Sequence, residues 1–393
     1  MQTRINGFLS RFNVRLTDRV IILTIIACAF LPAVLSLLSL AIIAATLLII
    51  KRTRRIVLSS RLTLWLIPLA PLSVIPPIVH RNYIGVVSGV GLVLLMILMS
   101  YMSKTMTSDI FERATRLACG ASVIAMFAAI FERIAYAIWP HLSQNKDLRC
   151  MSVFYNPNLF GSVIVFVILM CLYKILSHRG NVRIYAAIIA CNLISMALCG
   201  SMLGMAELVV GVFFLLLFNR RWAIVGVFAA VAAVGVGALA IYPQLLPRLF
   251  EASESFNLRV RVWQLALVMF REAPVFGRGI LSYMTFSPDY VGADLGFKVW
   301  VTTCAHSLLL DALICLGMVG ACVITAYLVR LIVPAVKNHI RRSDRAVTAL
   351  ALAATAGALF HGLMDETVAW PQVTVLFFLL LAGAAACGRE KQN

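Results

Sequence analysis

A histidine followed by a serine and two spaced glycines is the clearest candidate for chemistry in this sequence. His306 and Ser307 begin an apolar stretch that also contains Gly317 and Gly320. A neutral imidazole near an aqueous boundary can accept a proton from a hydroxyl, which is what the activation of an alcohol acceptor requires. The spacing alone favours a simpler interpretation, in which the histidine is hydrogen-bonded at a helix start and the glycines allow close helix packing.

Two arginines at the start of the stretch LRVRVWQLALVMFRE precede this histidine. The guanidinium groups of Arg259 and Arg261 can each bind phosphate oxygens through two parallel hydrogen bonds. Arginines in solvent-exposed loops are commoner than phosphate ligands, so the pair alone indicates little.

Further polar residues occur near the ends of long apolar runs, where a charge is costly and usually has a partner or a task. They are Glu132, Arg133, Asn156, Asn158, Glu207, His361 and Asp365. In the topology derived below, all of them lie on the external side of the membrane. Simpler explanations exist for some: Asn156 followed by Pro157 is typical of a capped helix start, and His361 and Asp365 are four residues apart and can pair on one helical face.

The composition indicates a protein whose solvent is largely lipid. Of the 393 residues, 62% are hydrophobic and 13% are charged, and the mean hydropathy is +0.96, which excludes an ordinary soluble domain. Long apolar runs without two-residue alternation predict membrane helices, and thus an all-α fold. The formal net charge of +18 lies in short clusters between these runs, so it indicates membrane topology and no nucleic-acid partner.

The apolar runs predict about twelve transmembrane helices in a single integral membrane domain over residues 1–393. The uncharged stretch 20–50 is too long for one typical span and contains Pro32, so it predicts two short helices. The other ten are expected at about 62–79, 82–101, 117–139, 158–176, 183–199, 203–218, 222–242, 305–333, 346–363 and 371–387.

Basic residues concentrate in the segments between alternate pairs of these helices. The positive-inside rule therefore predicts that both ends of the chain lie in the cytoplasm. The same orientation makes residues 243–304 a large extracytoplasmic loop, and loops of this length usually carry function. Within it, we expect a short helix over 258–272 that is capped by Asn257, followed by a turn over 274–279.

The ten cysteines show no spacing typical of a metal site, and no Cys-x-x-Cys pair occurs. Most lie in apolar runs, where cysteine packs as a small apolar side chain. Cys150 and Cys304 both fall on the predicted external side, where a disulfide between them would persist. Because no carboxylate cluster has metal-ligand spacing either, the sequence predicts neither a metal nor another cofactor.

Taken together, these residues resemble the O-antigen ligase and O-antigen polymerase superfamily of polytopic membrane glycosyltransferases. The ligase signature is His followed by Asn, Ser or Gln, then nine residues, Gly, two residues, and Gly, Thr or Tyr. His306, Ser307, Gly317 and Gly320 match it in full.

The resemblance extends from about Phe154 to the end of the chain, while the first four helices match in hydropathy alone. An accompanying Arg-x-x-x-Leu motif of the large loop is matched by Arg261 and Leu265. One departure is the turn over residues 200–204, where relatives often have Ser-Arg and this chain has no arginine. Any phosphate contact made there in relatives must be absent here or supplied by another residue.

The resemblance implies that a preassembled glycan moves from undecaprenyl diphosphate to an acceptor hydroxyl, on the periplasmic side of the bacterial inner (cytoplasmic) membrane. Arg261, with Arg259, would neutralise the diphosphate, and His306 would orient or deprotonate the hydroxyl. The remaining polar residues named above would bind substrate. Besides membrane lipid, the partners would be this donor and an acceptor.

The acceptor separates two activities within the family. Lipid A core would be the acceptor of a ligase, and another carrier-linked glycan would be the acceptor of a polymerase. The complete histidine signature favours the ligase. A lipid-linked oligosaccharide flippase or a secondary transporter is the alternative from another class, but transporters place their substrate sites near the membrane midplane.

Overall fold

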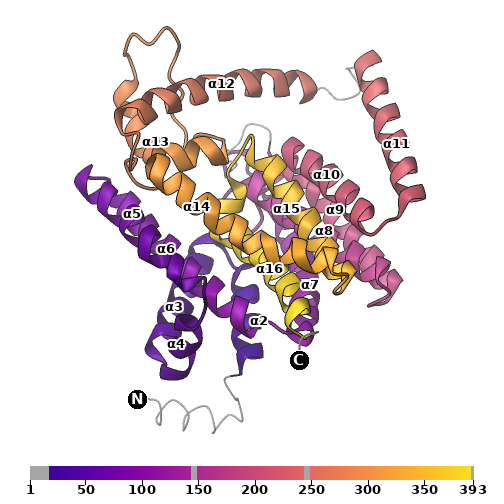
Figure 1. Ribbon diagram of the computed structural model, residues 1–393. Helices are drawn as coiled ribbons and strands as arrows, with labels where there is room; N and C mark the ends of the chain where they lie inside the picture. The colour runs from indigo at the N-terminus through magenta and orange to yellow at the C-terminus, as the bar shows by residue number, and fades with distance from the viewer. Residues whose placement is uncertain (1–16, 143–147, 243–247, 391–393) are drawn as a thin grey trace.

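Helices make up all the regular structure in residues 17–142, 148–242 and 248–390, which are the parts described by the computed structural model (Figure 1). The all-α prediction is therefore confirmed. The first part of the chain forms α2 (Asp18–Cys28), α3 (Ala33–Ile49), α4 (Lys51–Leu58), α5 (Leu66–Val79), α6 (Tyr83–Thr105) and α7 (Ser108–Ile138). The second part forms α8 (Pro157–Leu176), α9 (Val182–Cys199), α10 (Met202–Phe218), α11 (Trp222–Ile241), α12 (Arg248–Glu272), α13 (Ser282–Phe286), α14 (Leu308–Ile340), α15 (Arg345–Gly362) and α16 (Pro371–Glu390).

Several of these helices are long and apolar enough to cross a membrane. Within the described residues six qualify, namely α6, α7, α8, α9, α14 and α16, and a seventh is added if the bent pair α3 and α4 counts as one span. The chain is thus a multi-pass membrane protein. A helix occupies each apolar run identified in the sequence, including one on each side of Pro32. The number of twelve spans and their orientation remain predictions.

The helices that position the site cross at small residues, which allow close approach where lipid provides no hydrophobic driving force between helices. A Cβ added to Gly161 of α8 would lie 2.9 Å from Ser201 Cβ. A Cβ added to Gly204 of α10 would lie 3.4 Å from Gly161 Cα. Gly357 of α15 packs in the same way against Glu207 and Gly211. These crossings bring the first residues of α8 and α10 close to the end of α15.

The large loop contains α12, which lies across the end of the bundle opposite to the end of α16 (Figure 1). Its buried face, which includes Val262, Leu265 and Met269, packs on the first part of α14. The expected helix over 258–272 is present, but Asn257 does not cap it because the helix already begins at Arg248. The start of α12 is polar, so apolar residues do not recur there with the helical period of 3.6. For this reason the sequence pattern placed the start of the helix too late.

Helix α14 is broken at Gly317, whose φ of 63° and ψ of −175° are not helical. The break exposes backbone groups of α14 that bind the turn after α12: Arg278 N donates to Ile314 O, and Met318 N donates to Pro274 O at 2.8 Å. A Cβ at Gly317 would lie 2.3 Å from the carbonyl of Val275. The glycine of the signature therefore permits pairing between two backbone segments, and this pairing fixes the turn over 274–279 to the helix that follows His306.

Candidate active site

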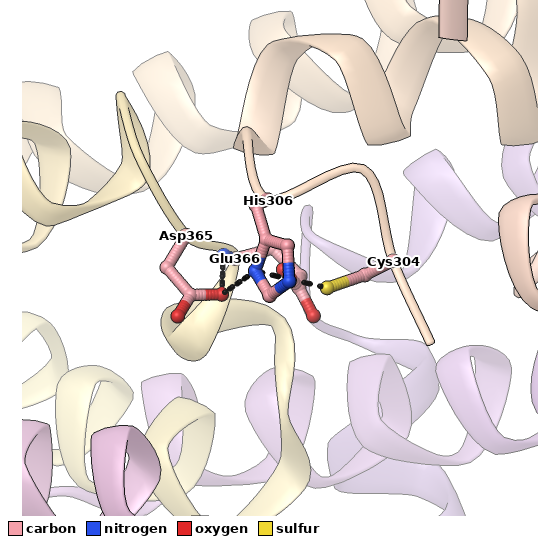
Figure 2. Close-up of side chains that lie close together, drawn as sticks. All are labelled: Cys304, His306, Asp365 and Glu366. Atoms are coloured by element: carbon pink, nitrogen blue, oxygen red, sulfur yellow. Dashed lines mark hydrogen bonds and ion pairs between the residues drawn. The ribbon is translucent and has the colours of Figure 1, made fainter. Parts of the chain in front are cut away.

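His306 and Asp365 meet where the loop before α14 approaches the loop after α15 (Figure 2). Asp365 Oδ1 lies 3.3 Å from His306 Nδ1, and the Asp365 side chain is 7% exposed. Burial by itself would raise the pKa of Asp365, but the hydrogen bond and charge of His306 outweigh it and hold this pKa below its ordinary value of 3.8. When the carboxylate accepts a hydrogen bond from Nδ1–H, Nε2 is left as the proton-accepting nitrogen of the neutral imidazole.

The backbone around His306 is held in an uncommon conformation. His306 has a φ of 48°, a left-handed value that is uncommon for a residue with a side chain and that often marks functional sites. The amide of the preceding Ala305 donates to both carboxylate oxygens of Asp311, at 2.9 and 3.1 Å. Trp263 Nε1 of α12 donates to the His306 carbonyl at 3.3 Å. Asp311 was not among the predicted site residues, although a lone carboxylate in an apolar run is a usable signal.

Asn158 connects Asp365 to the first residues of α8 and α10. Its Nδ2 donates to Asp365 Oδ2 at 2.8 Å, and its Oδ1 accepts from Arg149 at 2.8 Å and from Ser201 Oγ at 3.1 Å. Asn156 caps α8 by accepting from the Asn158 amide at 2.7 Å, which confirms the structural interpretation of the Asn-Pro-Asn start.

Arg149 was not among the residues predicted from the sequence, where it falls in a short segment that was expected to be external. Its Nε donates to the Cys199 carbonyl at 2.9 Å, so its guanidinium lies at the turn where relatives often carry an arginine. The available signal was its charge, because an arginine on the predicted external side is an exception to the positive-inside rule. A guanidinium is thus present at this turn, supplied by a residue about fifty positions earlier in the chain.

Glu366 and Cys304 lie beside the His306–Asp365 pair (Figure 2). Burial, followed by the charges of Asp365 and Asp311, raises the pKa of Glu366 from 4.5 to about 8. Burial, followed by the charges of Glu366, Asp311 and Asp365, raises the pKa of the Cys304 thiol well above its usual value. Glu366 Oε1 accepts from Trp370 Nε1 at 3.1 Å. Both acidic groups are therefore largely protonated at neutral pH, in contrast to Asp365.

A small polar cavity opens next to these groups. It is lined by residues from three segments, 155–159, 303–306 and 365–370. Tyr155 and Trp370 stack on one another along its wall, with ring centroids 5.3 Å apart and an interplanar angle of 17°. His306, Asp365 and Asn158 all face this cavity, so a reacting group placed in it can reach the imidazole.

The two predicted arginines of α12 differ in their surroundings. Arg259 is partly buried, donates through Nε to the carbonyl of Met364 at 3.2 Å, and donates to Ser255 Oγ at 2.7 Å. Arg261 is exposed, and within the described residues it has no hydrogen bond or ion pair. Arg259 therefore already contributes to the loop that carries Asp365, whereas Arg261 has its guanidinium available to a ligand.

Glu132 and Arg133 hold the segment that carries Arg149. Glu132 accepts from the amides of Met151 and Ser152, at 2.9 and 2.6 Å, and from the hydroxyl of Tyr136. Arg133 donates to the carbonyl of Leu148 at 2.8 Å. The structure gives both residues intramolecular partners and no contact with His306.

His361 and Glu207 form a buried pair in the interior of the helix bundle. His361 Nδ1 lies 2.6 Å from Glu207 Oε2, and the two side chains are 0% and 1% exposed. Ser162 bridges this pair to Thr367, with 2.9 Å to each of Glu207 and Thr367. The expected pairing of His361 with Asp365 is wrong, because α15 ends at Gly362 and Asp365 then turns toward His306.

The suggested disulfide between Cys150 and Cys304 is also not present. Both are buried free thiols. Cys150 donates its amide to Leu198, whereas the sulfur of Cys304 lies 3.6 Å from His306 Nδ1. A shared compartment was the sole reason to pair them, and the fold places them in different contacts.

Comparison with known families agrees with the motifs. A family model described as O-antigen ligase matches residues 184–325, which include Arg261, His306 and Gly317. Arg149, Asn158 and Asp365 lie outside this range and join the site through the fold. No curated protein matches the chain. This match supports membership of the chain in the O-antigen ligase superfamily, whose members are glycosyltransferase-like enzymes.

Proposed function

We propose that the protein transfers a glycan from undecaprenyl diphosphate to an acceptor hydroxyl, as an O-antigen ligase-type glycosyltransferase. The observation that carries this proposal is the His306–Asp365 pair, in which a buried carboxylate orients an imidazole at the wall of a polar cavity. A histidine oriented through one nitrogen can act as a general base through the other.

In the proposed step, the acceptor hydroxyl gives its proton to His306 Nε2. The acceptor oxygen forms a bond to the anomeric carbon of the donor sugar, and the bond between that carbon and the diphosphate oxygen breaks. The diphosphate leaves with the electron pair of the broken bond. Asp365 stays ionised and stabilises the imidazolium that forms, as its lowered pKa allows.

Guanidinium groups would stabilise the charge that develops on the leaving diphosphate. Arg261 is the candidate on α12, because its side chain is exposed and has no partner among the described residues. We propose that Arg149 supplies the positive charge at the turn over 200–204, where it contacts the carbonyl of Cys199. Since arginines can stabilise this charge, we expect the transfer itself to need no metal.

We place this chemistry on the periplasmic side of the bacterial inner membrane. The supporting observations are the charge bias of the sequence and the position of α12, which lies at the end of the bundle opposite to basic helix α4 (Figure 1). Donor diphosphate would then approach the cavity from the membrane surface on the side of α12. A reporter fused after Arg220 or Lys337 should be cytoplasmic, and one near Ser287 should be external.

The proposal is tested with purified protein in lipid nanodiscs. Transfer of a labelled glycan from the lipid diphosphate to lipid A core, with release of the diphosphate carrier, is the expected result. Growth of the glycan when carrier-linked repeat units are the sole substrate would identify a polymerase instead. Movement of the carrier-linked glycan across vesicles without a new glycosidic bond would show a flippase and overturn the proposal.

A further inference from the structure

Four potential metal ligands from two separate loops converge beside the proposed base. One ligand atom each from Cys304, His306, Asp365 and Glu366 lies within 4.8 Å of all the others. His306 Nδ1 is 3.6 Å from Cys304 Sγ and 3.3 Å from Asp365 Oδ1. In a tetrahedral zinc site, ligand atoms bonded at about 2.0 to 2.3 Å are separated by roughly 3.3 Å for N and O and roughly 3.6 Å for N and S. The observed separations agree with this geometry.

An unsatisfied oxygen gives a second indication of a ligand. Glu366 is 8% exposed, and its Oε2 is buried without a hydrogen-bond partner, although Oε1 accepts from Trp370. Figure 2 shows Glu366 behind the imidazole, between Asp365 and Cys304. A buried carboxyl oxygen without a hydrogen-bond partner is costly, and a cation that replaced the proton of Glu366 among the four groups would remove that cost.

We propose that Cys304, His306, Asp365 and Glu366 form a binding site for a soft divalent cation, Zn²⁺ in the first instance. Thiolate and imidazole ligands select zinc over magnesium or calcium, which prefer oxygen alone. Binding requires the thiol of Cys304 and the carboxyl of Glu366 to lose their protons, so affinity increases with pH. The four ligands then carry three negative charges, which the cation largely neutralises.

Such a site would inhibit transfer, a consequence that rests on the proposed function. The cation would bind His306 Nδ1 and Asp365 together, and the imidazole would lose the hydrogen bond that makes it a base. With the cation on Nδ1, the single ring proton of the neutral imidazole is carried by Nε2, which can then no longer accept the proton of the acceptor hydroxyl. The site opens to the same cavity as the reacting groups, so an ion in solution can reach it.

Binding is tested without reference to activity, with the full-length protein in nanodiscs and Zn²⁺ alone as the probe. Equilibrium dialysis should give one tightly bound zinc per chain. Cys304→Ser and Glu366→Gln should each weaken it by more than about tenfold, since even partners of ligands are typically worth that much. Cys322→Ser, which changes an exposed cysteine of α14, is the matched control and should bind as the wild type does.

Cobalt reports whether the thiol is a ligand. Bound Co²⁺ should give a thiolate-to-metal charge-transfer band in the wild type and in Cys322→Ser, and this band should disappear in Cys304→Ser. No bound zinc, equal affinity in all variants, or a bound cobalt ion without the band would overturn the site. Two substitutions at different ligands guard against a variant that simply fails to fold.

Inhibition is then measured as the ratio of transfer with and without Zn²⁺ within each variant. We expect strong inhibition of the wild type and a sensitivity at least tenfold lower in Cys304→Ser. If zinc binds as described and the protein has no transferase activity, the proposed function fails and the metal site stands. If transfer occurs and zinc does not bind, the metal site fails and the proposed function stands.

Discussion

Asp365 contacts His306 across 59 residues of sequence, and its second oxygen is held by Asn158. This relationship makes Asp365 a positioning residue for the proposed base. Asp365→Asn should keep the shape of the loop but lose the charge that favours the Nδ1-protonated imidazole and stabilises imidazolium. We expect the transfer rate at matched folded protein to fall by about a hundredfold or more. Asp289→Asn, at an exposed acidic residue of the large loop, should have no effect. Equal rates for the two variants would remove Asp365 from the mechanism.

The arginines should differ in what they contribute. Arg261→Ala should weaken donor binding and slow transfer, each by on the order of tenfold or more, because a hydrogen-bonded charge pair is worth about 1.5 to 3 kcal/mol. Arg261→Lys should recover part of the loss, since lysine supplies charge without the guanidinium fork. Arg149→Ala should show the same donor-binding defect if it serves the turn over 200–204. Binding is measured with labelled lipid diphosphate.

Arg271→Ala provides the control for these variants, because Arg271 is an exposed arginine at the end of the same helix α12. Its donor affinity should equal that of the wild type. Were Arg271→Ala and Arg261→Ala to lose affinity equally, the effect would be a general one of surface charge, and a specific diphosphate contact at 261 would be ruled out.

Gly317→Ala should destabilise the protein far more than an alanine at a glycine that also has positive φ but free space around it. Both Gly317 and Gly292 have positive φ, at 63° and 89°. At Gly292 nothing lies within 4 Å of an added Cβ, so the cost is the left-handed conformation, about 1 to 2 kcal/mol. At Gly317 the Cβ also collides with Val275 backbone. Thermal unfolding in detergent should separate them, and similar melting temperatures would contradict the role assigned to backbone pairing.

Glu366 should make stability depend on pH. Because its pKa rises from 4.5 to about 8 on folding, the unfolded chain releases this proton at lower pH than the folded protein does. The contribution of Glu366 to the free energy of unfolding is therefore largest below about pH 4.5, and it is lost as the pH rises toward 8. Between pH 5.5 and 8.5, Glu366→Gln should lose less thermal stability than the wild type. Parallel losses in the two proteins would refute the buried, protonated state of Glu366.

The helical architecture was predictable because apolar runs and Pro32 report directly on segments that must satisfy their own backbone in lipid. The His306 signature was also predictable, since it lies within one continuous stretch. The pairing of His306 with Asp365 was not, because it depends on α15 ending at Gly362 and on the loop that then turns. Likewise, Arg149 reaches the turn over 200–204 through helix packing at Gly161 and Gly204, which local sequence does not encode.

The most direct test of the central claim measures donor binding and transfer in parallel for His306→Ala. The variant should bind labelled lipid diphosphate nearly as the wild type does, because the diphosphate is held by arginines. Its transfer rate, at matched folded protein in nanodiscs, should fall by about a hundredfold to ten-thousandfold, the usual contribution of one general base. A folded His306→Ala protein that transfers glycan at the wild-type rate would contradict the assignment of His306 as the base and leave its motif a feature of helix packing alone.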